Sequence, residues 1–287
     1  MKILVTGGSG QLGLSLNAVR KDYPAHTFAF TDIPETDITD EESVQRAIEK
    51  YDPDIIVNCA AYTAVDRAEE DSDAAYRINS DGAGILAALA RECGIKLIHI
   101  STDYVFDGKA CNPLTEESPV NPESVYGKSK FEGEEKIRIS GCDAAVIRTA
   151  WLYSEYGSNF VKTMLRLAET RDSINVVSDQ TGNPTYAADL AHAVIKVAED
   201  DISGYEIYNF SGGGVATWND FAREIFALAN VSMQVNPIAT EDYPAKAPRP
   251  QYSVLLKDKI KSLGVAVPYW KDSLRVCLRN MGYVIHD

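Results

Sequence analysis

Three glycines near the start of the chain constrain its fold more than any other feature. Gly7, Gly10 and Gly13 are spaced three residues apart, between the apolar run Ile3-Leu4-Val5 and a segment with helical patterning, 11–22. In a strand–turn–helix of this kind, backbone N–H groups and the helix N-terminus can hold phosphate groups. The alternative is a glycine-rich turn with a structural role alone.

Short apolar runs alternate with helix-like segments through the first half of the chain. Expected strands lie at 27–30, 55–57, 96–100 and 144–147, and expected helices at 41–51, 72–93 and 125–139, with Gly94 as a C-cap. This alternation predicts an α/β fold, a Rossmann-type doubly wound parallel sheet with helices on both faces. Ligands of such sheets bind at the carboxyl ends of the strands.

The pattern is less regular in the second half. Segments 218–229 and 271–281 are typical of helices, whereas 236–253 contains four prolines and is expected to be a loop or lid. We therefore expect a dinucleotide-binding domain over 1–150, which can regain segments from the second half. Residues 151–287 are expected to form mainly a smaller, discontinuous substrate-binding lobe.

Composition excludes several classes of protein. A formal net charge of -14 argues against nucleic acid as a partner, because phosphate backbones require a basic surface. The chain has no run of eighteen apolar residues, and its N-terminal apolar run reaches Gly7 too soon for a signal-peptide core. We expect no membrane span and a cytoplasmic location.

Cysteine and histidine usage gives no support to a disulfide framework or a metal site. The five cysteines are an odd number without a CxxC pair, so we expect free thiols in a reducing compartment. The four histidines (His26, His99, His192 and His286) are scattered, and none lies at metal-ligand spacing from another. We expect no metal.

The glycine turn, together with an aspartate, points to a nicotinamide dinucleotide. Gly7 permits the tight turn, Gly10 lets a pyrophosphate approach the backbone, and Gly13 lets helix and strand pack closely. Asp32 follows Gly13 by 19 residues, and its carboxylate can accept both ribose hydroxyls of NADH while repelling a 2′-phosphate. No arginine follows Asp32 closely, so the sequence favours NADH over NADPH. A turn or capping aspartate is the alternative.

Tyr126 and Lys130 are candidates for acid–base chemistry. They are four residues apart and lie on one helical face. A phenol titrates near pH ~10, and an ammonium and an oxidised nicotinamide ring lower that pKa, so Tyr126 can act as a general acid towards a carbonyl. Thr102, after the strand 96–100, can bond the reacting oxygen, and Asp103 a substrate hydroxyl. The alternatives are an ordinary helix face and a polar strand exit.

Several motifs resemble those of one enzyme superfamily. The glycine turn, Asn58-Cys59-Ala60-Ala61-Tyr62-Thr63, Ser101-Thr102-Asp103-Tyr104-Val105-Phe106 and Tyr126–Lys130 follow in the order found in extended short-chain dehydrogenases/reductases. Within it, the chain resembles the dTDP-4-dehydrorhamnose reductase family over nearly its whole length. Further motifs support this: Arg148-Thr149-Ala150-Trp151-Leu152-Tyr153 and Asp179-Gln180-Thr181-Gly182-Asn183-Pro184-Thr185.

The resemblance implies an NAD(P)H-dependent reduction of the C4 ketone of dTDP-4-dehydro-L-rhamnose. It makes Tyr126 the proton donor, supported by Lys130 and Thr102, and implies sugar-nucleotide contacts from Thr102, Asp103 and Trp151. Arg249 is a candidate for the substrate diphosphate, the alternative being an exposed loop arginine; for Trp151 the alternative is a core position. The implied cofactor contacts are Gly7, Gly10, Gln11, Leu12, Gly13, Asp32, Asp37, Ile38, Ala61, Tyr62, Thr63, Tyr126 and Lys130.

One departure bears on metal and assembly. Some relatives carry an acidic residue two positions after the last loop glycine, used in a magnesium-bound dimer contact, whereas this chain has Ser15. A hydroxyl is a poor substitute for a carboxylate ligand. We therefore expect a monomer or weak homodimer without that magnesium.

Other functions stay open, and one of them is that of another sugar-nucleotide reductase of the same superfamily. Sugar-nucleotide dehydratases of the superfamily carry an acidic residue where this chain has Tyr104, and the epimerases typically lack an aspartate at the position of Asp103. A non-catalytic NAD(P)-binding regulatory subunit has the same fold and glycine turn. The presence of Tyr126, Lys130 and Thr102 favours an enzyme.

Overall fold

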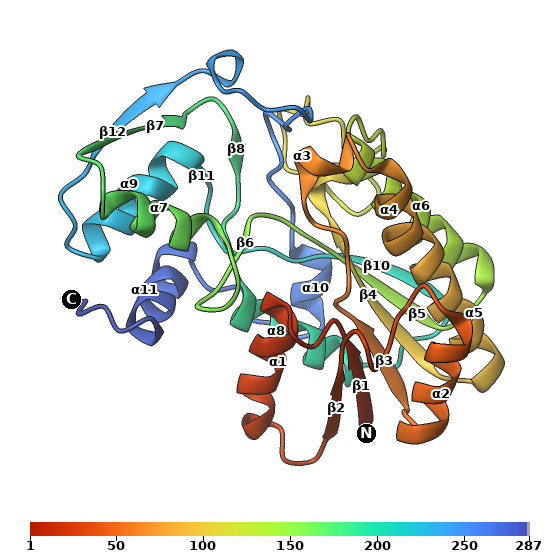
Figure 1. Ribbon diagram of the computed structural model, residues 1–287. Helices are drawn as coiled ribbons and strands as arrows, with labels where there is room; N and C mark the ends of the chain where they lie inside the picture. Colours follow the sequence, from red (N-terminus) through yellow and green to blue (C-terminus); the bar gives the residue numbers. More distant parts are fainter. Residues whose placement is uncertain (286–287) are drawn as a thin grey trace.

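A six-stranded sheet organises one lobe of the computed structural model, which describes residues 1–285 (Figure 1). The order is β2-β1-β3-β4-β5-β10, and every neighbouring pair is parallel. The strands are β1 (Lys2–Thr6), β2 (Thr27–Thr31), β3 (Ile55–Asn58), β4 (Lys96–Thr102), β5 (Ala144–Thr149) and β10 (Tyr205–Asn209). The predicted Rossmann-type fold is confirmed. Strand order reverses between β1 and β3, where such sheets form a binding crevice.

Helices cover both faces of this sheet (Figure 1). α1 (Gln11–Val19) and α8 (Ala187–Ala198) lie on one face, and α2 (Glu41–Tyr51), α5 (Gly82–Cys93) and α6 (Val125–Ser140) on the other. Successive residues of β1 point to opposite faces: Ile3 and Val5 join the α1/α8 core, and Leu4 joins the α2/α5 core. Burial on both faces explains the continuous apolar runs of these strands.

The long helix expected over 72–93 has an interruption. α4 (Ser72–Tyr76) passes through a π-helical turn, Arg77–Asp81, into α5, which ends at Gly94 with a positive φ of 66°, as expected for a C-cap. The α-helix expected over 11–22 ends at Val19, and a 3-10 turn, Arg20–Asp22, follows it.

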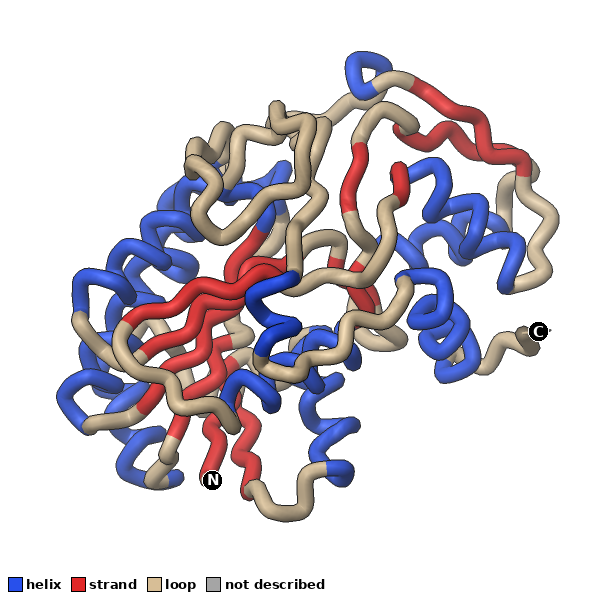
Figure 2. Tube along the Cα trace, turned by 180° about the vertical axis from the view of Figure 1, so that it is seen from behind, coloured by secondary structure: helices blue, strands red, loops and turns tan. Residues whose placement is uncertain are grey.

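A second lobe lies on the side of the sheet's carboxyl ends (Figure 2). α7 (Phe160–Ala168), α9 (Trp218–Leu228) and α11 (Trp270–Asn280) share one core, and β7 (Ser173–Val177) pairs with β12 (Gln234–Ile238). Short elements complete the chain: α3 (Val65–Ala68), β6 (Leu152–Tyr153), β8 (Thr181–Gly182), β9 (Thr185–Tyr186), β11 (Ala216–Thr217) and α10 (Asp258–Ser262).

The expectation of a loop over 236–253 is wrong for the first residues of that range. β12 extends to Ile238, and a 3-10 turn covers Thr240–Asp242. Pro237 is accommodated because β12 belongs to a two-stranded sheet, where the missing N–H leaves no central ladder incomplete.

Segments from the second half return to the first lobe. α8 packs beside α1, and β10 adds the edge strand next to β5. Ile260 of α10 and the following Val265 enter the same core. Among residues 1–285, no helix has the length and apolar character required to cross a membrane.

Candidate active site

The glycine turn has the geometry of a phosphate-binding loop. Gly7 has a φ of 68°, and a Cβ there would lie 2.5 Å from the backbone nitrogen of Ala60. A Cβ on Gly13 would lie 2.5 Å from the carbonyl oxygen of Gly7, so Gly13 serves close packing. α1 begins at Gln11, and its cap, Gly10, supplies no side-chain bond to the first N–H groups. Those groups suit phosphate oxygens.

Asp32 lies at the end of β2 beside this turn. Its carboxylate accepts hydrogen bonds of 2.9 Å from the backbone N–H groups of Ser9 and Ile33. Asp32 therefore stabilises the glycine turn, which was the alternative role for this residue. It also lines a cavity of about 220 Å³, as does Thr36, whose hydroxyl is buried without a partner. Other residues of the implied cofactor set line this cavity as well: Gly7, Gly10, Asp37, Ile38 and Ala61.

The expected reactive residues meet in a neighbouring cavity of about 610 Å³. It extends from the glycine turn to the carboxyl ends of β4 and β5. Tyr126, Lys130 and Thr102 all line it, as do the expected substrate residues Asp103 and Trp151. The implied cofactor residues on its wall are Gly10, Gln11, Leu12, Ala61 and Thr63. Both cavities share Gly10 and Ala61, so together they suit one extended dinucleotide.

In the protein without bound cofactor, burial keeps the phenol of Tyr126 protonated. It raises the pKa of Tyr126 above its ordinary value of 10.0, and a hydrogen bond with Thr102 acts in the lowering direction. Burial therefore opposes the lowering of this pKa that is expected from Lys130 and the nicotinamide ring. The ring of Tyr104 meets that of Tyr126 edge to face, with centroids 5.5 Å apart.

Thr102 and Asp103 form a buried pair at the end of β4. The Thr102 hydroxyl donates to Oδ1 of Asp103 at 3.1 Å and accepts the N–H of Tyr104 at 3.2 Å. Burial raises the pKa of Asp103 to about 6, although hydrogen bonds from Ser253 and Thr102 act in the lowering direction. Oδ2 of Asp103 is buried without a partner, so it can accept a substrate hydroxyl.

Lys130 is buried on α6, one turn after Tyr126. Burial lowers the pKa of Lys130 to about 8. Its Nζ donates to the carbonyl oxygen of Ile100 at 2.6 Å and lies 3.1 Å from Nε2 of His99. The amine is therefore fixed in position at the cavity wall.

Trp151 combines a strained backbone with an aromatic stack. Its φ is 49°, unusual for a residue with a Cβ, and its ring lies parallel to that of Trp218 at a centroid distance of 3.7 Å. The indole packs against core residues but also faces the main cavity, so both sequence interpretations describe part of its surroundings.

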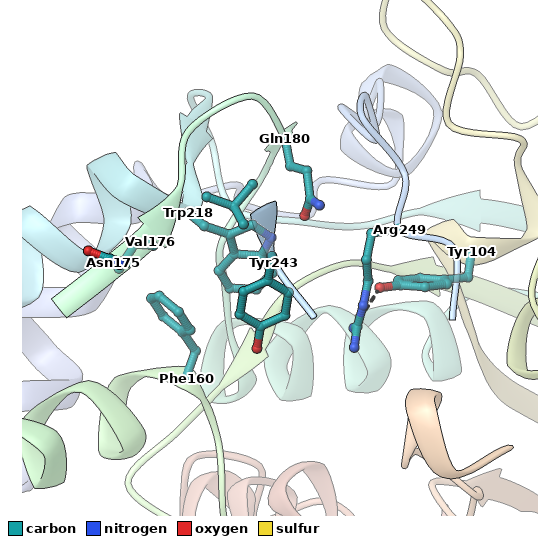
Figure 3. Close-up of a pocket in the computed structure, with 9 residues that line it drawn as sticks. Tyr104, Phe160, Asn175, Val176, Gln180, Trp218, Tyr243 and Arg249 are labelled. Carbon is teal, nitrogen blue, oxygen red and sulfur yellow. Dashed lines mark hydrogen bonds between the residues drawn. The ribbon is translucent and has the colours of Figure 1, made fainter. Parts of the chain in front are cut away.

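Next to the main cavity, a second cavity of about 220 Å³ opens between the lobes (Figure 3). It is distinct from the cavity of similar volume beside Asp32. Phe160, Trp218 and Tyr243 supply aromatic walls, and Asn175 and Gln180 supply amides. Its remaining lining residues are Tyr104, Val176, Val177 and Arg249. Tyr104 lines this cavity as well as the main one, so the two adjoin there.

Arg249 is not a free loop arginine. Its Nη1 donates to the Tyr104 hydroxyl at 3.2 Å, and its Nη2 is paired with the carboxylate of Asp66 (Figure 3 shows the bond to Tyr104). Nε of Arg249 is buried without a partner. The guanidinium thus lies where the two cavities meet, although it does not line the main one.

Two implied cofactor residues lie outside both cofactor cavities. Gly13 acts through packing, and Tyr62 is held by Asn79, whose side chain bonds both its N–H and its carbonyl at 2.8 and 3.1 Å. Ser15 is buried and donates to the carbonyl of Gln11 at 2.9 Å. Within the described residues no group of three or more His, Cys, Asp or Glu side chains is placed to hold a metal; His286 lies outside them.

Comparison with known proteins decides the family. A model described as RmlD substrate binding domain matches residues 1–283. This chain belongs to that family. SpsK, a spore coat polysaccharide biosynthesis protein of Bacillus subtilis, is 44% identical over 279 residues, covering 97% of each chain.

Other RmlD-family relatives carry more specific names. A dTDP-4-dehydrorhamnose reductase of Aggregatibacter actinomycetemcomitans is 42% identical over 286 residues, covering 96% of this chain and 97% of its own. The crystal structure of a dTDP-4-dehydrorhamnose reductase from Bacillus anthracis, in complex with NADP, is 38% identical. It superposes with a TM-score of 0.93 and covers 97% of this chain and 99% of that one.

Several residues of this RmlD-family site could not be found from the sequence. Asn79 lies in the π-helical turn and reaches Ser129 of α6 at 3.0 Å, which ties the cofactor side to the helix of Tyr126. Trp218 and Tyr243 join the second cavity from segments far from the motifs. A π turn is often found at functional sites, but this one is visible only in the structure, so it gave no signal in the sequence.

Proposed function

We propose that this chain reduces the C4 ketone of dTDP-4-dehydro-L-rhamnose to dTDP-L-rhamnose with NAD(P)H, within nucleotide-sugar and cell-surface polysaccharide biosynthesis. One observation carries the proposal: Tyr126, Lys130 and Thr102 share a cavity with the glycine turn. The relatives named dTDP-4-dehydrorhamnose reductase support the substrate.

The chain's own residues supply the proton and the orientation. When bound, the nicotinamide supplies a hydride, with its electron pair, to the ketone carbon. Tyr126 transfers its phenolic proton to the ketone oxygen as the C–O double bond becomes single, and solvent returns a proton to the phenolate. Thr102 would orient that oxygen, and Lys130 would hold the nicotinamide ribose. In balance, ketone, reduced cofactor and one proton give alcohol and oxidised cofactor.

NADH is the proposed preferred cofactor, with NADPH as the second. The carboxylate of Asp32 is held beside the glycine turn by two backbone N–H groups and would repel a 2′-phosphate. NADP in the Bacillus anthracis relative supports NADPH as a usable cofactor.

The substrate is proposed to span the two adjoining cavities. The sugar would lie against Thr102, Asp103 and Trp151 in the main cavity, and the diphosphate beside Arg249. The base would then enter the second cavity, where aromatic rings can stack on it and the amides of Asn175 and Gln180 can bond its edge. In this arrangement the segment 1–150 provides the cofactor site, and 151–287 provides most of the substrate lobe.

The test follows NADH absorbance as candidate 4-keto sugar nucleotides are added, with the product identified by NMR. Stoichiometric NADH loss with dTDP-4-dehydro-L-rhamnose is expected. Loss with another ketosugar alone would change the substrate. Tightly retained NAD that is unchanged after turnover would indicate an epimerase or dehydratase, and no consumption would favour a regulatory subunit.

The proposed assembly is a monomer or weak homodimer. Ser15 is buried with its hydroxyl bonded to Gln11, so it offers no ligand for a shared magnesium. Light scattering with magnesium and with EDTA should give the same molar mass; a larger mass with magnesium alone would refute this.

A further inference from the structure

A chain of buried polar side chains lies behind the candidate proton-transfer site. Thr6 of β1, Asn58 of β3, His99 of β4 and Lys130 of α6 are each 1% exposed, and consecutive members are 2.8, 3.0 and 3.1 Å apart. Of these four, only Lys130 lines the main cavity.

The amide of Asn58 has one orientation that satisfies its neighbours. Its Oδ1 accepts the backbone N–H of Ala60 at 3.1 Å and the hydroxyl of Thr6 at 2.8 Å. A backbone N–H can only donate, so the amide oxygen must face Ala60. Nδ2 of Asn58 therefore faces Nδ1 of His99 and donates to it at 3.0 Å.

This contact determines the tautomer of His99. A nitrogen that accepts a hydrogen bond carries no proton, so the proton of the neutral imidazole resides on Nε2. Burial holds the pKa of His99 well below its ordinary value, so the ring is neutral. The Nε2–H group then points at Nζ of Lys130, 3.1 Å away.

Only an uncharged lysine can accept that hydrogen bond. An ammonium has three donors and no lone pair, whereas an amine has two donors and one lone pair. Neutral Lys130 accepts from His99, donates to the carbonyl of Ile100 at 2.6 Å, and keeps one N–H for the cavity. Protonation would set an ammonium N–H against the imidazole N–H.

Other groups facing Lys130 act in the opposite direction. Glu134 and Cys59 raise its pKa, but burial exceeds both and lowers the value to about 8. The Glu134 carboxylate is already bonded to Arg148 and Ser101. Tyr126 and Asp103 line the same cavity as the amine.

We propose that Asn58 and His99 are positioning residues that favour the neutral amine of Lys130 over its ammonium form in the free protein. This inference rests on the proposed function, in which a lysine ammonium lowers the pKa of the proton donor Tyr126. Reduction should therefore slow as the pH rises and Lys130 loses its proton. The pair would thus place the basic limb of the reduction near pH 8, below the ordinary pKa of a lysine.

The first test is NMR of the full-length protein with labelled histidine and lysine, without ligand. The His99 signals are assigned by their loss in His99→Phe. A protonated Nε2, an unprotonated Nδ1, and a Lys130 Cε signal that titrates near pH 8 are expected. A protonated Nδ1, or a Lys130 that titrates above pH ~10, would overturn the proposal.

A near-isosteric variant should reverse the direction of the hydrogen bonds between residue 58, His99 and Lys130. In Asn58→Asp, a carboxylate faces Nδ1 and requires its proton, so Nε2 becomes an acceptor for a lysine ammonium. The Lys130 titration should then move up by at least about one pKa unit, because the charged form gains a partner. Asn112→Asp adds the same charge on an exposed loop and should leave it unchanged. An unmoved titration in folded Asn58→Asp would refute the role of the pair.

Activity separates positioning from simple support. The basic limb of kcat/KM for reduction should move to higher pH in Asn58→Asp by the same shift as the lysine titration. A structural role would lower the rate at every pH without moving the limb, and would overturn the proposal. If no ketone is reduced while the NMR results hold, the proposed function fails and the control of Lys130 stands.

Discussion

The ring of Tyr104 meets the ring of Tyr126 edge to face at a centroid distance of 5.5 Å, and its hydroxyl accepts a hydrogen bond from Arg249. Tyr104 therefore lies between the candidate proton donor and the candidate diphosphate ligand. The resemblance to extended short-chain dehydrogenases/reductases implies an acidic residue at this position in the dehydratases of that superfamily. A neutral ring here packs against the donor and supplies no base, which suits a reductase.

Removal of the Tyr126 hydroxyl tests the proton donor. We expect Tyr126→Phe to lower kcat by about 10²- to 10⁴-fold, the usual contribution of general acid catalysis, and to leave NADH affinity unchanged. Tyr23→Phe removes a hydroxyl that bonds His192, away from both cofactor cavities, and should keep full activity. Steady-state kinetics and NADH fluorescence titration measure the two effects. Unchanged turnover in Tyr126→Phe would exclude Tyr126 from the mechanism.

Asp32 should determine cofactor preference. Asp32→Ala loses the acceptor for the ribose hydroxyls and the repulsion of a 2′-phosphate. We expect kcat/KM for NADH to fall about tenfold or more, from the loss of a charge-assisted bond worth ~1.5–3 kcal/mol, while that for NADPH falls less or rises. Asp22→Ala, on the exposed turn after α1, is the matched control. An unchanged NADH/NADPH ratio would contradict this role.

Arg249 should act on substrate binding alone. Arg249→Ala removes a guanidinium from the junction of the two cavities, and we expect KM for the sugar nucleotide to rise about ten- to hundredfold with KM for NADH unchanged. Asp66→Asn frees the guanidinium from its present partner and should lower the same KM about fivefold or less, the scale of a ~1 kcal/mol ion pair. A rise in KM for Asp66→Asn would show that the pair holds Arg249 in its binding position.

The titration of Asp103 should make stability depend on pH. Its pKa is about 6 in the folded protein against 3.8 ordinarily, so between these values the folded state binds more protons than the unfolded state. This contribution to stability is fully present below pH ~4 and is lost as the pH rises through about 6, with a total of ~3 kcal/mol. Urea unfolding of wild type and Asp103→Asn at pH 4 and pH 7 measures it. We expect wild type to lose stability relative to Asp103→Asn between pH 4 and pH 7; a constant difference would contradict the buried-carboxylate account.

Most of the central sheet could be predicted because its strands are marked by short sequence patterns. Apolar runs alternate with helical patterns, and the glycine turn follows the first strand, so five of the six strands were located. β10 and α8 were not, because they follow a stretch of irregular connections and their place beside β5 and α1 depends on tertiary contacts.

The reactive cluster was predicted in part for the same reason. Tyr126, Lys130 and Thr102 belong to short motifs at helix and strand ends, and the structure brings them together. The aromatic cavity could not be predicted as a whole, since Trp218 and Tyr243 join Phe160 from two other segments of the chain. Its position depends on how the second lobe folds back.

The return of β10 and α8 has a consequence for the growing polypeptide. When residue 150 has left the ribosome, β5 is an open edge with unpaired peptide groups, and one apolar face of β1 and α1 lacks its covering helix. The nascent nucleotide-binding half therefore cannot close until residues 187–209 have emerged, and its core is complete only after Val265. During synthesis this half would be a natural client for chaperones that shield sheet edges.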